Sequence, residues 1–165
     1  MQPIKIGILS DTHIYTITPE FRQKVAACFN ETSIILHAGD LTSPEILTAF
    51  GDKEVHAVHG NMCEAAGRRC LPRQKTITIG GFTIGLIHNS GYAYDFEDQL
   101  LDEFGAIDCI VYGHTHRPVC HKTGSILFIN PGSFMTTGRF GAPGTYAILE
   151  VGDELKAAIY EVPLP

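Results

Sequence analysis

The chain has 165 residues, the size of one ordinary domain, and 44% of them are hydrophobic against 18% charged, so we expect a globular protein with a packed core. Its 12 Lys and Arg are outnumbered by 18 Asp and Glu, which gives a formal net charge of −6. This excess of acid argues against a protein that holds nucleic acid or an anionic membrane by bulk charge.

The number and spacing of the cysteines and the lengths of the apolar runs indicate the cellular compartment to expect. The 5 cysteines are odd in number and form no C-x-x-C pair, which argues against a disulfide framework or a structural zinc site and favours a reducing compartment. The first apolar stretch, 4–9, is too short for a signal-peptide core, and no stretch reaches the roughly 18 residues of a membrane span. We therefore expect a cytoplasmic protein without membrane contact and one domain over 1–165. Homo-oligomerisation is left open.

The first sixty residues alternate between apolar strand patterns and helix-start signals. Apolar runs at 4–9, 33–37 and 55–59 are typical of strands covered on both faces. Thr18-Pro19-Glu20 and Ser43-Pro44-Glu45 each place an N-cap residue before a proline and an acid that suit a first helical turn. This alternation predicts parallel strands joined by right-handed crossovers. The first helix should reach about residue 29 and bury Phe21, Val25, Cys28 and Phe29.

The second half of the chain has a different character. Runs at 76–79 and 82–87 flank Gly80-Gly81, which predicts a β-hairpin. The remaining expected elements are a helix at 96–104, a strand at 109–112, and antiparallel-like strands at 125–129, 145–151 and 157–162. We therefore predict an α/β fold in which two mixed sheets pack face to face with helices outside.

Short polar clusters follow five of the apolar segments. Because the carboxyl ends of strands line the ligand crevice of an α/β sheet, all five clusters can converge on one site. Taken singly, most of these clusters are typical of an ordinary turn or of a hydrogen-bonded histidine at a strand end. The cluster with two histidines after one strand is less easily explained in that way, and the occurrence of all five in order predicts a shared site. The clusters are Asp11-Thr12-His13, Gly39-Asp40, Gly60-Asn61, His88-Asn89 and Gly113-His114-Thr115-His116.

The donor types in these clusters suit two borderline divalent ions. Imidazole favours manganese, iron, zinc, nickel or cobalt, and a carboxylate can bridge two of them. An oxygen-only set would have favoured magnesium or calcium. Two divalent ions with the two aspartates would leave the centre at about +2. Such a centre suits a phosphate ester, because negative charge develops on the phosphoryl oxygens during hydrolysis.

The order D-x-H, G-D, G-N, H and G-H-x-H resembles the calcineurin-like metallophosphoesterase superfamily. The resemblance covers residues 4 to about 150 and implies a four-layer sandwich of two sheets flanked by helices. The segments that are similar to its small single-domain bacterial and archaeal phosphodiesterase branch are Ser10-Asp11-Thr12-His13, His37-Ala38-Gly39-Asp40, Tyr112-Gly113-His114-Thr115-His116 and Asn130-Pro131-Gly132-Ser133.

The same resemblance implies a ligand set and a reaction. It implies in-line attack on phosphorus by a hydroxide that bridges two metal ions, without a covalent enzyme intermediate. Manganese is the favoured ion, with nickel, zinc, iron and cobalt as alternatives, and the substrate is a small phosphate ester. The implied ligands are Asp11, His13 and His116 for one ion, Asn61, His88 and His114 for the other, and Asp40 bridging both.

Two departures from the family pattern concern the proton donor and the substrate. Many members place a His after the motif Asn to protonate the leaving group, whereas here Met62 and Cys63 follow Asn61. The general acid is therefore unassigned, with His59 as a candidate and a packed strand-end histidine as its alternative. The second departure is Asn89, where the family usually has Gly after its metal-binding His. We expect Asn61 and Asn89 to contact substrate.

Two other functions compete with a phosphodiesterase. Proteins that resemble this fold include a trafficking subunit that binds partners and has a degraded catalytic centre, so a non-catalytic scaffold is one alternative. A nuclease is the other, since some relatives cut nucleic acids. All seven implied ligand positions hold competent residue types, which weighs against the scaffold, and the acidic balance weighs against a long polyanion.

Overall fold

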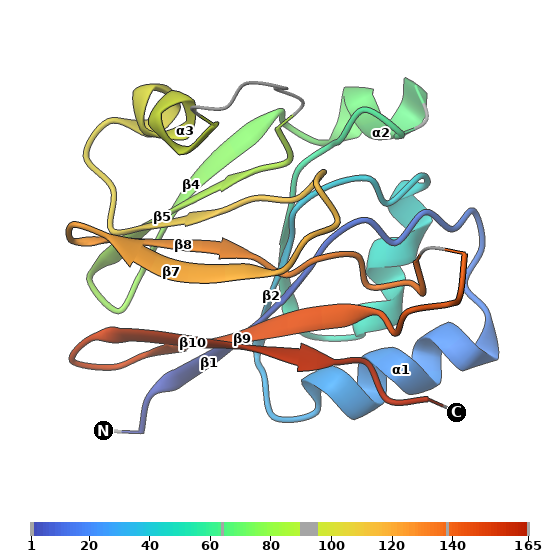
Figure 1. Ribbon diagram of the computed structural model, residues 1–165. Helices are drawn as coiled ribbons and strands as arrows, with labels where there is room; N and C mark the ends of the chain where they lie inside the picture. The colour runs from blue at the N-terminus through green and yellow to red at the C-terminus, as the bar shows by residue number, and fades with distance from the viewer. Residues whose placement is uncertain (1, 64, 90–95, 138, 165) are drawn as a thin grey trace.

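Two five-stranded sheets pack face to face in the computed structural model, which describes residues 2–63, 65–89, 96–137 and 139–164 (Figure 1). The first sheet has the order β10-β9-β1-β2-β3, and the second has the order β4-β5-β6-β8-β7. The strands of the first sheet are β1 (Ile4–Leu9), β2 (Ile34–His37), β3 (Glu54–Ala57), β9 (Thr145–Val151) and β10 (Leu155–Glu161). Those of the second are β4 (Gln74–Ile79), β5 (Phe82–Ile87), β6 (Cys109–Val111), β7 (Val119–Thr123) and β8 (Ile126–Asn130).

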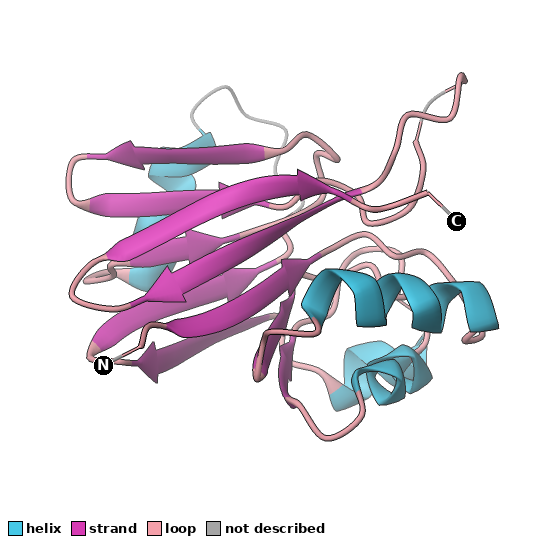
Figure 2. Ribbon diagram, turned by 90° about the horizontal axis from the view of Figure 1, so that it is seen from below, coloured by secondary structure: helices cyan, strands magenta, loops and turns pink. Residues whose placement is uncertain are grey.

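Helices cover the outer faces of both sheets. The two helices that follow β1 and β2 pack on the outer face of the first sheet, and the short helix after β3 contacts the second of them. The helix before β6 covers the outer face of the other sheet, so that helices lie on both sides of the stacked sheets in Figure 2. The predicted four-layer α/β sandwich is therefore confirmed. The helices are α1 (Pro19–Phe29), the 3₁₀ helix η1 (Pro44–Phe50), α2 (Ala65–Cys70) and α3 (Phe96–Phe104).

Alternation along the strands explains the layers. Ile6 and Ile8 of β1 lie in the apolar core between the sheets, whereas Leu9 packs with α1 and η1 on the outer side. In β6, Val111 points into the inner core, and Ile110 packs outward beneath α3. Because each of these strands contributes side chains to two apolar cores, its sequence is a continuous apolar run, as expected for a strand covered on both faces.

Strand pairing confirms most of the predicted topology and corrects one part. β1 pairs in parallel with β2, and β2 with β3, as the alternation of strands and helices predicted. β4 and β5 form the predicted hairpin, with positive φ at both turn glycines. The prediction for 125–129 was wrong in part, because β8 runs parallel to β6 and antiparallel only to β7.

No helix among the described residues is both long and apolar enough to cross a membrane.

Candidate metal centre

All seven predicted ligands lie in loops that leave the carboxyl ends of strands. Loops after β1, β2 and β3 bring residues from the first sheet, and loops after β5 and β6 bring the rest from the second. Because the two sheets face each other, these loops meet at one end of the sandwich. The structure therefore brings the seven side chains together, in two groups that share Asp40.

The first group comprises Asp11, His13 and His116. The two imidazole Nε2 atoms lie 3.3 Å apart, and Asp11 Oδ1 lies 3.1 Å from His116 Nε2 and 3.6 Å from His13 Nε2. Donors about 2.1 Å from one ion lie about 3.0 to 3.4 Å apart at octahedral or tetrahedral angles. The spacing in this group therefore fits a single small divalent cation.

The second group gathers around Asn61. Its Oδ1 lies 3.1 Å from His88 Nε2 and 3.1 Å from His114 Nδ1. Asp40 Oδ2 lies 3.2 Å from His88 Nε2, and the donor atoms of Asp40, His88 and His114 all lie within 4.8 Å of one another. Two imidazole nitrogens, an amide oxygen and a carboxylate oxygen suit the same class of ion.

Asp40 connects the two groups. Its Oδ2 lies 3.2 Å from His88 Nε2 in the second group and 4.0 Å from His13 Nε2 in the first. The other oxygen, Oδ1, accepts a hydrogen bond of 2.7 Å from the backbone N–H of Met62, which fixes the carboxylate plane. Only Oδ2 therefore faces both groups, the arrangement that a bridging carboxylate requires.

Hydrogen bonds on the side away from the centre orient two of the candidate ligands, so that their remaining donor atoms face the centre. His88 Nδ1 donates to the carbonyl oxygen of Ala38 at 2.7 Å, so Nε2 is left as the donor atom toward the site. Asp11 Oδ2 accepts from Ser10 Oγ at 2.6 Å and from the backbone N–H of His114 at 3.2 Å. Oδ1 of the same carboxylate is left to face His13 and His116.

The backbone is strained where the candidate ligands sit. Left-handed φ angles are uncommon for residues with a side chain, and they gather at sites that the surrounding structure holds in place. Of the seven such non-glycine residues in the described chain, five are candidate ligands. These five are Asp11 (54°), His13 (46°), Asp40 (53°), His114 (70°) and His116 (57°).

Burial and charge set the protonation of the centre. Burial opposes ionisation of Asp11, but contacts with His116 and His13 outweigh it and hold the pKa of this carboxyl well below its ordinary value. Burial also opposes ionisation of Asp40, and the hydrogen bond with His88 lowers its pKa overall. Burial lowers the pKa of His114, which favours neutral imidazole, whereas the hydrogen bond with Asp11 raises the pKa of His116. Burial also opposes protonation of His88, but contacts with Asp40 and Asp11 outweigh it and raise the pKa of this imidazole. Ionised carboxylates and neutral imidazole are the forms that bind metal, so the bound ions would compete with protons at His88 and His116.

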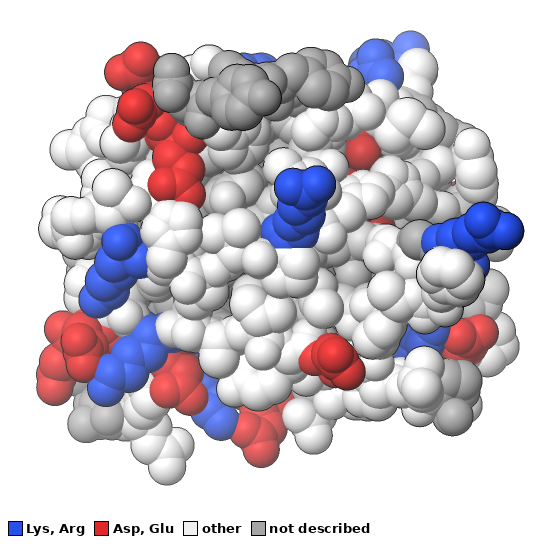
Figure 3. Space-filling model, viewed as in Figure 1, with Lys and Arg blue, Asp and Glu red and all other residues white. Residues whose placement is uncertain are grey.

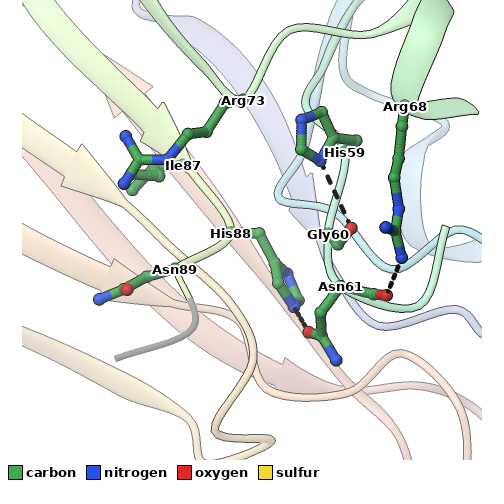
Figure 4. Close-up of a pocket in the computed structure, with 8 residues that line it drawn as sticks. All are labelled: His59, Gly60, Asn61, Arg68, Arg73, Ile87, His88 and Asn89. Atoms are coloured by element: carbon green, nitrogen blue, oxygen red, sulfur yellow. Dashed lines mark hydrogen bonds between the residues drawn. The ribbon is translucent and has the colours of Figure 1, made fainter. Parts of the chain in front are cut away.

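A pocket of about 220 Å³ opens beside the second group (Figure 4). His59, the candidate proton donor, lies in its wall, with Nδ1 3.4 Å from the carbonyl oxygen of Gly60. Asn89 also lines the pocket, but its amide extends to the opposite side of the chain from the His88 ring. Sequence reasoning missed two further lining residues, Arg68 and Arg73. No motif marks them, because one comes from α2 and the other from the loop before β4.

Comparison with known proteins agrees with this geometry. The model of the calcineurin-like phosphoesterase superfamily domain matches residues 4–154. The chain belongs to this superfamily. The family predicted from the five motifs is thus confirmed.

Proteins similar to this chain include two archaeal relatives. The chain is 37% identical over 164 residues to a probable metallophosphoesterase of Methanothermobacter thermautotrophicus, covering 97% of this chain and 94% of that protein. It is 30% identical over 144 residues to a phosphodiesterase of Methanocaldococcus jannaschii, covering 78% and 83%. Among solved structures, Vacuolar Protein Sorting 29 from Cryptosporidium parvum shares the fold, with a TM-score of 0.80, 21% identity and coverage of 99% and 93%.

Proposed function

We propose that the protein is a phosphodiesterase that hydrolyses a small phosphate ester with two divalent transition-metal ions bound at the candidate metal centre. The observation that carries the proposal is the shared carboxylate. Oδ2 of Asp40 faces both donor groups, at 3.2 Å from His88 Nε2 and 4.0 Å from His13 Nε2. Separate single-ion sites would not need this oxygen between them.

The donor types and spacings fit such ions, and manganese is our first choice, with nickel, zinc, iron and cobalt as alternatives. When bound, the ions would lower the pKa of a coordinated water and offset the negative charge of the phosphoryl oxygens. The side chains that would hold them are Asp11, His13 and His116 for one ion, Asn61, His88 and His114 for the other, and Asp40 for both.

The residues after Asn61 favour a diester with a good leaving group. Met62 has no proton to give, and Cys63 is buried and accepts a hydrogen bond from the backbone N–H of Gly60 at 3.1 Å. We propose His59, in the pocket wall, as the proton donor; its Nδ1 lies 3.4 Å from the carbonyl oxygen of Gly60. An enzyme without a proton-donating side chain directly after its motif Asn works best on esters whose leaving group needs little protonation.

Charge supports a small substrate over a nucleic acid. The net charge is −6. On the face drawn in Figure 3, basic side chains are scattered among acidic and uncharged ones and form no continuous basic surface. A long polyanion is usually held by a continuous basic surface. The phosphodiesterase of Methanocaldococcus jannaschii supports the same reaction class.

A non-catalytic scaffold is the second candidate, because Vacuolar Protein Sorting 29 shares this fold. That similarity concerns the fold alone. The donor atoms aimed into the centre in this chain favour the enzyme, since a scaffold has no use for strained, inward-facing ligands.

Hydrolysis of bis(p-nitrophenyl) phosphate with added manganese or nickel tests the proposal. We expect the wild-type protein to hydrolyse this diester and Asp40→Ala to lose at least about 100-fold in hydrolysis rate. Removing a residue that supports a metal ligand typically lowers activity by about 10- to 100-fold, and Asp40 is itself a candidate ligand. Asp153→Ala, which changes an exposed carboxylate far along the chain, is the matched control and should retain activity.

Substrate preference is tested in the same assay. The aryl diester should turn over faster than an alkyl phosphomonoester. Equal or better hydrolysis of the alkyl monoester would contradict a diesterase, and well-folded protein without activity under several metals would favour the scaffold.

A further inference from the structure

The pocket beside the second donor group has a cationic wall. Its lining includes Arg68 and Arg73, and no carboxylate-bearing residue among those the structure describes lines it. Figure 4 shows the two arginines on either side of His59, with Asn61 and His88 beneath. Two arginines in one pocket wall are notable in a chain with a net charge of −6, and they favour an anionic ligand.

Arg68 is tied directly to a candidate ligand. Its Nη2 donates to the backbone carbonyl oxygen of Asn61 at 2.8 Å, while the side-chain Oδ1 of the same Asn61 faces His88 and His114. The guanidinium is therefore hydrogen-bonded to the main chain of the residue whose side-chain oxygen faces the candidate metal centre. No described carboxylate forms an ion pair with Arg68, and its side chain is exposed.

Arg73 has a different environment. Its guanidinium is held by Glu103 at 2.7 and 2.9 Å and by Gln74 Oε1 at 2.8 Å. Glu103 forms an ion pair with Arg73, so Arg73 shapes the wall, whereas the charge of Arg68 is not offset by an ion pair with any carboxylate that the structure describes. Guanidinium groups bind carboxylate and phosphate through paired hydrogen bonds, which makes Arg68 the better anion receptor.

We infer that this pocket binds a second anionic group of the substrate, a carboxylate or a further phosphate, through Arg68. The inference rests on the proposed function, since the first anionic group would be the phosphoryl group at the metal centre. A substrate that carries its second anion a few bonds from the reacting phosphorus would reach Arg68 while its phosphoryl oxygens face Asn61 and His88. The substrate class is thus a phosphodiester with an additional acidic group.

Binding of non-hydrolysable phosphonates to manganese-loaded protein tests this inference by calorimetry, independently of turnover. Propylphosphonate carries one anionic group, while 3-phosphonopropionate and propane-1,3-diphosphonate carry a second one, as carboxylate or phosphonate. We expect at least one of the two-anion probes to bind the wild-type protein about 10-fold more tightly than propylphosphonate. The better of the two identifies the preferred anion.

Two variants separate the role of Arg68 from general charge. Arg68→Gln should bring the affinity ratio between the two-anion probes and propylphosphonate to about 1. Arg69→Gln removes the same charge from the next residue of α2, which is exposed and outside the pocket lining, and should keep the wild-type ratio. The ratio within each variant corrects for any change in bound manganese, which is measured in the same samples.

The outcomes are distinct. Equal affinities for all three probes in the wild-type protein, or the same ratio in Arg68→Gln as in Arg69→Gln, would overturn the second-anion site and leave the proposed hydrolysis intact. A wild-type protein that binds no phosphonate and hydrolyses no diester would overturn the proposed function together with this inference.

Discussion

His37 lies behind the candidate metal centre and is fully buried. Its Nδ1 accepts the backbone N–H of Gly39 at 3.2 Å, and its Nε2 lies 3.2 Å from Thr12 Oγ1. Since a backbone N–H can only donate, the ring is neutral with its proton on Nε2. The imidazole thereby connects the loop that carries Asp11 to the loop that carries Asp40 without touching either carboxylate.

This burial makes the stability of the protein depend on pH. Burial lowers the pKa of His37 to about 4, against the opposing charge of Asp11, while the unfolded chain keeps the ordinary value near 6.5. Between these values the unfolded state binds more protons, so the contribution is present above pH 6.5 and is lost as the pH falls toward 4. For metal-free protein, His37 should account for a loss of roughly 2 kcal/mol in unfolding free energy between pH 7 and pH 5.

Urea unfolding of the wild-type protein and of His37→Asn at both pH values checks this expectation. Asparagine retains an acceptor for Gly39 and does not titrate, and all other groups are shared by the two proteins. The same pH dependence in both would show that His37 is not buried as a neutral ring.

The predicted site residues could be found from sequence because each follows an apolar strand directly. Asp11, Asp40 and His114 need no knowledge of distant packing once the strand ends are known to meet at one edge. Arg68 gave no such signal, because its role depends on a single contact with the Asn61 carbonyl that only the folded turn creates. The direction of the Asn89 amide, away from the His88 ring, was equally hidden, because Asn89 has a left-handed φ of 61° that the sequence does not indicate.

Among the secondary-structure elements, a helix was predicted correctly where the sequence held both a capping residue and a regular spacing of apolar residues. Thr18 caps α1 through a hydrogen bond from the N–H of Phe21 at 3.1 Å, and the helix buries the four residues predicted from its spacing. The Ser43-Pro44-Glu45 signal gave the start of a helix but not its type, since Pro44–Phe50 is a 3₁₀ helix that ends at Gly51 with a φ of 63°.

Two elements escaped prediction for physical reasons. β7 is an edge strand whose residues are mostly exposed, so Val119–Thr123 lacks an apolar pattern. α2 has six residues and buries only Gly67, so it shows no helical periodicity. This short helix nevertheless carries Arg68, which donates a hydrogen bond to the carbonyl oxygen of Asn61.

The turn after β3 offers a direct test of how an element positions the site. A Cβ on Gly60 would lie 2.0 Å from Asp40 Oδ1, which already accepts the Met62 N–H. Gly60→Ala should therefore displace the carboxylate and reduce phosphodiesterase activity by about 100-fold, as loss of a supporting contact does in metal sites.

Gly152→Ala is the control for that substitution. A Cβ there would lie 3.6 Å from Pro3, an ordinary contact, and the backbone has no left-handed φ. Circular dichroism of both variants establishes that each is folded. Unaltered activity in Gly60→Ala would show that the close approach of Gly60 does not hold Asp40 in place.

At the scale of the whole molecule, the sandwich brings two sheets to one centre. β1, β2 and β3 supply one side of it, and β5 and β6 supply the other, across an apolar core that contains Ile8, Leu36 and Val111. Neither sheet alone holds a full donor set, because the first group needs His116 from the second sheet and the second group needs Asp40 from the first. The fold and the proposed chemistry therefore depend on the same packing.

The number of metal ions bound per chain is the decisive measurement for a two-ion centre that shares Asp40. Chelator-treated wild-type protein, titrated with manganese by calorimetry, should bind two ions per chain, and Asp40→Ala should lose the paired binding while Asp153→Ala keeps it. A wild-type protein that binds no ion or a single one, or an Asp40→Ala variant that still binds two with unchanged affinity, would contradict the shared carboxylate on which the proposed hydrolysis rests.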